Sequence, residues 1–184
     1  MSGREKHVRN TQRVECASHI RHTFGPVYDA RSRVLILGTM PSPKSREYGF
    51  YYGHPRNRFW PVMAALFDAP LPQTNAEKEA LVRAHGVALW DVLASCTIMG
   101  ASDASIRDPE PNDIGLVLRA AEIRVIYTTG SKAAELYRRY CLPQTGIPAV
   151  TLPSTSPANA RMRLADLIRA YRVILNDLNG GNTK

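Results

Sequence analysis

The sequence predicts an α/β fold in which helices cover both faces of a parallel sheet. Short apolar runs recur along the chain, and we predict strands at residues 34–37, 87–93, 124–128 and 148–152. Segments with helical spacing of apolar residues separate these runs, and such alternation is typical of a parallel sheet. All strands of this sheet would end at the same edge, so the segments that follow them should meet there.

The first strand carries the clearest signal. Residues 34–37 read Val-Leu-Ile-Leu, Gly38 ends the run, and a polar loop rich in glycine and proline continues to Asn57. Ligands of open α/β sheets bind beyond the carboxyl ends of strands. This loop is therefore the first candidate for a functional site.

The first two helices follow from apolar spacing and from residues that start or stop a helix. Residues 59–67 place apolar side chains on one helical face, and the Ala-Pro-Leu-Pro segment 69–72 ends that helix. Asn75 is a suitable N-cap for a helix that runs to His85, and Gly86 is a suitable residue to end it.

The second half of the chain predicts one long loop and three helices. Residues 95–113 show little periodicity and many turn formers, so we expect an ordered loop. Asn112 or Asp113 can cap a helix through Ala121, and residues 132–140 form the next helix. The last helix repeats apolar residues at three- and four-residue spacing, namely Leu164, Leu167, Ile168, Tyr171, Ile174 and Leu175.

The length of 184 residues and the apolar content of 44% suit a single buried core. We expect one domain over residues 33–177, preceded by a basic N-terminal arm at residues 1–32 that packs on it. Residues 26–28 of this arm suggest a turn or a short strand, and residues 178–184 read as a flexible tail. No apolar run has the length of a membrane span, and the charged N-terminus lacks a signal core, so a cytoplasmic protein is expected.

The formal net charge of +8 favours a polyanionic partner, with nucleic acid first, although a basic protein without such a partner is the alternative. Cys16, Cys96 and Cys141 are too few for a four-cysteine zinc or iron–sulfur site and predict reduced, buried thiols. The histidines of the N-terminal arm lack metal-like spacing. We therefore expect no metal and no cofactor.

The predicted edge of the sheet carries none of the common catalytic motifs: no GxSxG, no HExxH, no P-loop lysine and no GxGxxG. It is rich instead in hydroxyls, amides and aromatic rings. Ser156 and Pro157 resemble an N-cap followed by proline at the first helical position, and with Ser154 and Thr155 this helix start would suit a phosphate. An ordinary helix cap is the alternative.

Asn57 and an aromatic triplet stand out in the first loop. Asn57 lies between two arginines, where it could cap the following helix, orient a water molecule or hold a polar ligand edge. The triplet at residues 50–52, Phe-Tyr-Tyr, could stack on bases or pack as a satellite core under the loop.

Two segments together resemble the hypoxanthine-DNA glycosylase branch of the uracil-DNA glycosylase superfamily. They are GTMPSPKSREYGFYYGHPRNRFW at residues 38–60 and LPSTSPAN at residues 152–159, and they follow the first and last predicted strands. The HPxNRFW element is also similar to the mismatch-specific uracil glycosylases. The likeness extends in outline over residues 33–175.

The resemblance implies a three-layer α/β/α sandwich around a four-stranded parallel sheet. It implies a monofunctional DNA glycosylase that needs no metal. Nothing in the sequence calls for a dimer, so we expect a monomer without a cofactor. Its partner would be single- or double-stranded DNA that contains a deaminated base. Hypoxanthine is the leading substrate, with uracil and xanthine as alternatives.

Two positions depart from the pattern of other branches. Met40 stands where many members of the superfamily have an Asp or Asn that positions the attacking water. The hypoxanthine branch shares this absence, and the resemblance assigns the role to Asn57 instead. Ser154 stands where other branches have His or Asn, and its hydroxyl is a weaker stabiliser of a leaving base.

Cleavage of a glycosidic bond passes through an oxocarbenium-like sugar while negative charge grows on the leaving base, which must first be flipped out of the duplex. We expect Asn57 to orient the water or the base edge and Tyr52 to stack on the flipped base. The expected base-binding residues are Thr39, Met40, Pro41, Ser42, Tyr52, Asp91 and Ser154. The expected DNA-binding residues are Lys44, Arg46, Arg56, Thr155, Ser156, Pro157, Ala158, Asn159 and Arg161.

Two other functions remain open at this point. A DNA-binding module of the same fold without catalysis would be consistent with Met40 and Ser154. An unrelated α/β hydrolase or nucleotide-binding protein would turn over a free nucleoside or ester and would not bind duplex DNA.

Overall fold

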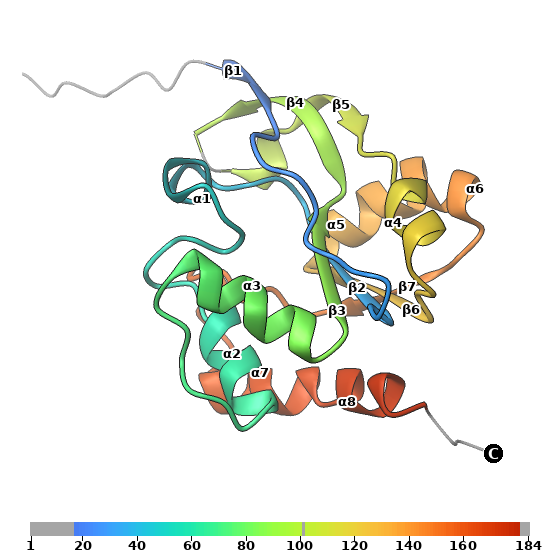
Figure 1. Ribbon diagram of the computed structural model, residues 1–184. Helices are drawn as coiled ribbons and strands as arrows, with labels where there is room; N and C mark the ends of the chain where they lie inside the picture. Colours follow the sequence, from blue (N-terminus) through green and yellow to red (C-terminus); the bar gives the residue numbers. More distant parts are fainter. Residues whose placement is uncertain (1–16, 101, 181–184) are drawn as a thin grey trace, which may run out of the picture.

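The computed structural model describes residues 17–100 and 102–180 and shows three layers, with a parallel sheet between two groups of helices (Figure 1). The sheet has four strands in the order β3-β2-β6-β7, and every pairing is parallel, which confirms the predicted sheet. Its strands are β2 (Val34–Gly38), β3 (Val87–Asp91), β6 (Val125–Thr129) and β7 (Ala149–Leu152). Every residue of β2 and β3 is buried, because helices cover both faces of the sheet.

Four helices cover one face of this sheet: α2 (Phe59–Leu66), α3 (Asn75–Ala84), α7 (Leu164–Tyr171) and α8 (Val173–Leu178). The other face carries α4 (Gly115–Ala120), α5 (Ser131–Leu136), a π-helical turn η2 (Tyr137–Cys141) and α6 (Leu142–Thr145). The predicted helices over residues 59–67, 75–85 and 132–140 are therefore confirmed within one or two residues. The predicted last helix is in fact two, because the chain breaks at Arg172.

Three residues that the sequence predicted as N-caps, Asn75, Asn112 and Asp113, do not cap their helices. The N-cap of α3 is Thr74, whose side chain accepts from the Glu77 N–H, and the Glu77 carboxylate accepts in return from the Thr74 N–H. Neither Asn112 nor Asp113 caps α4. The Asn112 amide donates instead to the carbonyl oxygens of Asp91 and Leu93, where it ties two strands together.

Residues 95–99 and 107–111 form strands within the segment that the sequence predicted to be one long loop. The chain bends at Val92, so the predicted strand 87–93 ends at Asp91, and β4 (Leu93–Met99) enters a second, antiparallel sheet of order β1-β4-β5. Its partners are β1 (Ala17–Arg21) and β5 (Arg107–Pro111), and the 3₁₀ turn η1 (Asp103–Ser105) precedes β5. The sequence RDPEP of β5 has low strand propensity, so pairing with β4 decides its conformation.

The N-terminal arm joins the domain at two places. Besides β1, Val27 pairs with Leu89 of β3 in an isolated antiparallel bridge, which agrees with the short strand predicted near residues 26–28. Residues 1–16 and 181–184, which include Cys16 and most of the predicted tail, lie outside the described residues. Cys96 and Cys141 are buried free thiols, as predicted.

The predicted loop after β2 contains a short helix, α1 (Pro43–Tyr48). The Ser42 side chain accepts from the Ser45 N–H, Pro43 occupies the first turn, and Gly49 ends the helix with φ of 66°. This arrangement of serine cap, early proline and terminal glycine stabilises even a helix of one or two turns. No helix in the described part of the chain is long and apolar enough to cross a membrane.

Candidate active site

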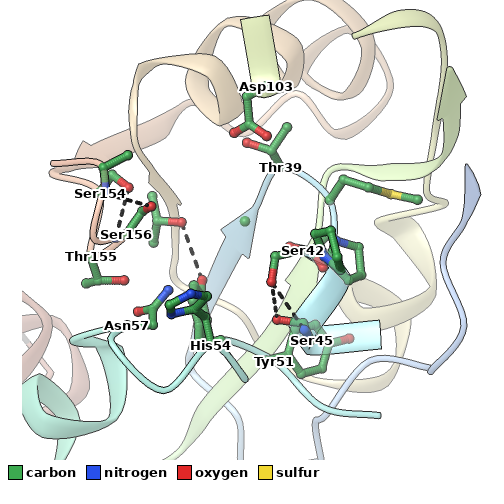
Figure 2. A pocket seen from close by; sticks show the side chains of 18 of the residues that line it. Thr39, Ser42, Ser45, Tyr51, His54, Asn57, Asp103, Ser154, Thr155 and Ser156 are labelled. Atoms are coloured by element: carbon green, nitrogen blue, oxygen red, sulfur yellow. Dashed lines mark hydrogen bonds between the residues drawn. The ribbon is translucent and has the colours of Figure 1, made fainter. Parts of the chain in front are cut away.

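A pocket of about 670 Å³ opens where the strands of the parallel sheet end. Both sequence motifs line it, together with the last residues of β3 and β6 and the connection between β4 and β5. Figure 2 shows Asn57, His54 and the Ser154–Ser156 segment on one side of the pocket and Ser42 and Ser45 on the other. The parallel topology thus brings together segments that are about 100 residues apart in the chain.

The structure places most of the predicted site residues around this one pocket. Asn57 and all seven expected base-binding residues line it, as do Arg46 and the whole segment from Thr155 to Asn159. Lys44, Arg56 and Arg161 do not line it and lie on the surface. Sequence reasoning did not identify Ser45, His54, Asp103 or Thr129, which also line the pocket.

Asn57 is held in one orientation by the start of α2. Its Oδ1 accepts a hydrogen bond of 2.9 Å from the Phe59 N–H, so the side chain caps the helix as the alternative interpretation proposed. Because a backbone N–H needs an acceptor, the atom of the Asn57 amide that faces Phe59 must be the oxygen. The two Nδ2 hydrogens are therefore left for other partners. The cap and a role in the pocket are therefore compatible, since the two roles use different atoms.

Arg58 connects the two motifs. Its guanidinium donates to the backbone oxygens of Ser156 and Asn159 at 2.8 Å each and also to the Met162 oxygen. Its backbone N–H donates to the Thr155 oxygen at 3.1 Å. Arg58 therefore fixes the second motif relative to its neighbour Asn57.

The second motif is not the helix start that the sequence predicted. Residues 156–162 form turns, and α7 begins only at Leu164, after Arg163. The carbonyl oxygens of Ser156 and Asn159 accept from Arg58, and the Ser156 oxygen also accepts from the Asn159 N–H at 3.0 Å in a turn. The Ser154 Oγ accepts from the Ser156 N–H at 3.2 Å, and its hydroxyl hydrogen remains available to donate.

The aromatic triplet divides between core and pocket. Phe50 and Tyr51 are buried in the main core and not in a separate satellite core, and the Tyr51 hydroxyl donates to the Gly25 oxygen at 2.8 Å. Tyr51 also lines the pocket. Tyr52 lines the pocket, but one face of its ring stacks on Phe59 with centroids 3.7 Å apart. Only its other face or its rim could therefore meet a base. Burial and the nearby charge of Asp91 raise the pKa of the Tyr52 hydroxyl well above its usual value, so it stays protonated.

Two carboxylates line the pocket in different surroundings. Asp91 ends β3 and is buried, and its Oδ2 lies 2.8 Å from the His22 Nε2. Asp103 lies in the exposed turn η1, beside Thr39 (Figure 2). Partial removal from water and the charge of Asp91 raise the pKa of the Asp103 carboxyl, while the Thr39 hydroxyl acts in the opposite direction.

The basic residues near the pocket have different partners. The Arg46 guanidinium donates to the Pro41 oxygen at 2.7 Å and supports the first motif. Lys44 pairs with Glu47 at 2.7 Å on the surface of α1. Arg56 and Arg161 are exposed, and the described part of the chain offers their side chains no hydrogen-bond partner. These two are the better placed to contact phosphates.

A sequence model of the uracil DNA glycosylase superfamily matches residues 26–179 of the chain. The chain belongs to this superfamily. A protein named hypoxanthine DNA glycosylase from Methanosarcina acetivorans is 35% identical over 144 residues, which cover 77% of this chain and 90% of that protein. A protein of the same name from Methanosarcina barkeri is 33% identical over 141 residues, which cover 75% and 87% respectively.

A solved structure agrees with the superfamily assignment. A solution NMR structure of a Methanosarcina acetivorans protein, provisionally named uracil DNA glycosylase, has a TM-score of 0.70 and 29% sequence identity. The alignment covers 84% of this chain and 98% of that one. These findings confirm the fold and the branch that the two motifs predicted, and they contradict the alternative of an unrelated hydrolase or nucleotide-binding protein.

Proposed function

We propose that this protein is a monofunctional DNA glycosylase that hydrolyses the N-glycosidic bond of hypoxanthine in DNA. The observation that carries the proposal is Asn57, whose amide is fixed by its Oδ1 contact to α2 and lines the pocket beside the second motif. The names of the two Methanosarcina relatives, hypoxanthine DNA glycosylase, support the choice of base. Uracil and xanthine are the alternative substrates.

The reaction needs a flipped nucleotide, a water molecule and donors for the leaving base. A pocket of about 670 Å³ is within the usual size range of small-molecule sites, so one extruded nucleotide is a reasonable occupant. The bond between the base nitrogen and C1′ breaks first, and its electron pair leaves with the base. Water then adds its oxygen to the cationic C1′, and the proton that it releases balances the negative charge on the departed base, which leaves as the neutral free base.

Asn57 is not a base that could take this proton, since an amide does not titrate in the accessible range. Its Nδ2 hydrogens can instead hold the water oxygen or an acceptor on the base, and its second Oδ1 lone pair can accept from the water. The Ser154 hydroxyl and the backbone amides of residues 39–42 can donate to the leaving base as its charge develops. Met40 contributes apolar packing to this wall of the pocket.

The surroundings of the pocket suit DNA. We assign the exposed residues Arg56 and Arg161, with Lys44, to phosphate contacts, and the segment from Thr155 to Asn159 to the strand beside the flipped nucleotide. Either single- or double-stranded DNA could supply the nucleotide. We further expect a monomer that acts in the cytoplasm.

The test separates the helix-cap role of Asn57 from its proposed role in catalysis. Asn57→Asp keeps an oxygen acceptor for the Phe59 N–H but removes the amide donor, whereas Asn57→Ala removes both. Both variants and the wild type would be incubated in single-turnover reactions with duplexes that contain deoxyinosine, deoxyuridine or deoxyxanthosine. Alkali would then cut the abasic products.

The proposal predicts excision of hypoxanthine by the wild type and a loss of about 100-fold or more in Asn57→Ala, whereas Asn57→Asp keeps an oxygen that can accept from the water. Thermal unfolding should show near wild-type stability for Asn57→Asp and a loss of about 1 kcal/mol for Asn57→Ala. An active Asn57→Ala protein would leave Asn57 only its cap role, whereas activity in Asn57→Asp alone would assign the water to the side-chain oxygen. Excision of uracil alone would replace hypoxanthine by uracil as the assigned substrate. Tight binding to DNA without any excision would favour the non-catalytic DNA-binding module.

A further inference from the structure

A second, smaller pocket of about 390 Å³ lies outside the candidate active site. Residues 21–25 of the N-terminal arm form one part of its wall, and residues near the bend between β3 and β4 form another. We infer that this pocket is a subsite for one nucleotide, with aromatic and hydrogen-bonding groups for the base and an arginine for the phosphate. The inference goes beyond the proposed function, because the pocket contains none of the residues assigned to catalysis.

The pair of His22 and Asp91 forms the boundary between the two pockets. His22 lines the second pocket, whereas Asp91 lines the candidate active site. The His22 Nε2 lies 2.8 Å from the Asp91 Oδ2, and the two side chains are only 5% and 7% exposed. The second pocket is therefore a neighbour of the active site and is separated from it by one buried pair of side chains.

Several polar groups of the second pocket are held in place but lack partners. Asn112 uses both Nδ2 hydrogens for the carbonyl oxygens of Asp91 and Leu93, at 2.9 Å each, which leaves its Oδ1 to accept from a ligand. The Trp90 indole is 8% exposed, and its Nε1–H has no hydrogen-bond partner in the described part of the chain. The His22 Nδ1 is buried and also lacks a partner among the described residues. Because buried polar groups almost always have partners, these atoms indicate a ligand that supplies them.

The unpaired groups match the edge of a nucleobase. Each base of DNA carries hydrogen-bond donors and acceptors side by side, so one edge can accept from the Trp90 Nε1–H and donate to the Asn112 Oδ1. The flat face of the base can pack against the Phe24 ring, which also lines the pocket. A volume of about 390 Å³ is within the range of small-molecule sites.

The charge of the pocket favours a phosphate attached to that base. Arg21 and Thr23 are exposed residues of its wall, and none of the described residues that line it is acidic. A guanidinium binds a phosphate through paired N–H groups. A metal cation would find no carboxylate here, and a purely apolar ligand would leave Trp90 and Asn112 unpaired. The nucleotide could be free in solution or belong to a DNA strand, and the experiment separates these two sources.

The experiment follows the indole N–H signals in heteronuclear NMR spectra. The sequence contains two tryptophans, and the Trp60 Nε1–H donates to the Tyr51 oxygen at 3.0 Å in the core, so its signal is an internal control. Trp90→Phe or Trp60→Phe, whichever folds, assigns the two signals. The probes are the deoxynucleoside monophosphates, the deoxynucleosides without phosphate, inorganic phosphate alone and a short oligothymidylate.

We expect at least one nucleotide, at millimolar concentration, to shift the Trp90 signal while the Trp60 signal stays in place. Arg21→Gln should weaken the binding of this nucleotide about 2- to 10-fold and leave the binding of its nucleoside unchanged. Arg107→Gln is the matched control, because Arg107 is an exposed arginine of β5 that lines neither pocket.

The concentration at which the Trp90 signal shifts identifies the source of the nucleotide. A shift at lower concentrations of oligothymidylate than of the monophosphates would assign the subsite to a DNA strand, and the reverse order would assign it to a free nucleotide. The inference is overturned if no nucleotide probe shifts the Trp90 signal, or if inorganic phosphate alone shifts it equally. Cleavage of deoxyinosine is assayed separately, and its absence would overturn the proposed function without affecting this result.

Discussion

The Arg58 guanidinium donates to the Asn159 backbone oxygen at 2.8 Å, although 101 positions separate these residues in the chain. The same side chain donates to Ser156 and Met162. A single arginine side chain therefore donates to three carbonyl oxygens in the segment from Ser156 to Met162. Because Arg58 directly follows Asn57, a change in this contact should affect both Asn57 and the second motif, which lie on the same side of the pocket (Figure 2).

Arg58→Ala should lower the free energy of unfolding by about 2–4 kcal/mol, since it removes the guanidinium donors to the carbonyl oxygens of Ser156, Asn159 and Met162. Chemical denaturation measures this change. Arg56→Ala is the matched control, because Arg56 lies two positions away with an exposed side chain, and its effect should stay within about 0.5 kcal/mol. Equal effects of the two substitutions would contradict the role given to Arg58.

Gly38→Ala should displace the Asp91 carboxylate, because the new Cβ would lie 2.1 Å from its Oδ1. We expect a loss of stability of about 1–3 kcal/mol and reduced excision of hypoxanthine. Gly25→Ala is the control, since no atom lies within 4 Å of a Cβ at Gly25. Thermal unfolding and single-turnover excision report the two effects, and a Gly38→Ala protein indistinguishable from the control would rule out the close packing at Asp91.

Binding to duplex DNA should weaken linearly with salt on a double logarithmic plot. Arg56→Gln and Arg161→Gln should each reduce the magnitude of the slope by about 0.9 if each arginine contacts one phosphate. Arg138→Gln is the control, because Arg138 is exposed in η2 and does not line the pocket. Fluorescence anisotropy at several salt concentrations measures the slopes. The same slope for all proteins would remove both arginines from the DNA-binding surface.

Stability should fall at alkaline pH partly because of Cys141. Burial raises the pKa of the Cys141 thiol to about 11 from an ordinary value of 9.0, so the native state keeps a proton that the unfolded state loses. The contribution is complete below about pH 9 and disappears as the pH rises to about 11, with a total of about 2–3 kcal/mol. Denaturation of the wild type and Cys141→Ala across this pH range should show a steeper decline in the free energy of unfolding for the wild type. Parallel declines would show that this thiol does not contribute.

The sequence by itself determined the parallel sheet, because strands buried on both faces appear as short, continuous apolar runs such as residues 34–37. It also determined that two motifs after the first and last strands share one pocket, since parallel strands all end at the same edge. The sequence pointed to Asn57 because its motif is local and specific, and this residue lines the pocket.

The tertiary structure alone decided the contacts that act across long distances in the chain. Strand β5 has a sequence of low strand propensity and forms because β4 provides a pairing partner. His22 contacts Asp91 although 69 positions separate them in the chain. Arg58 donates to the Ser156 carbonyl in the segment where the Ser156–Pro157 pattern had suggested the start of a helix. Local patterns describe the preferences of a segment, whereas these features depend on the hydrogen-bond partners that only the folded chain brings near.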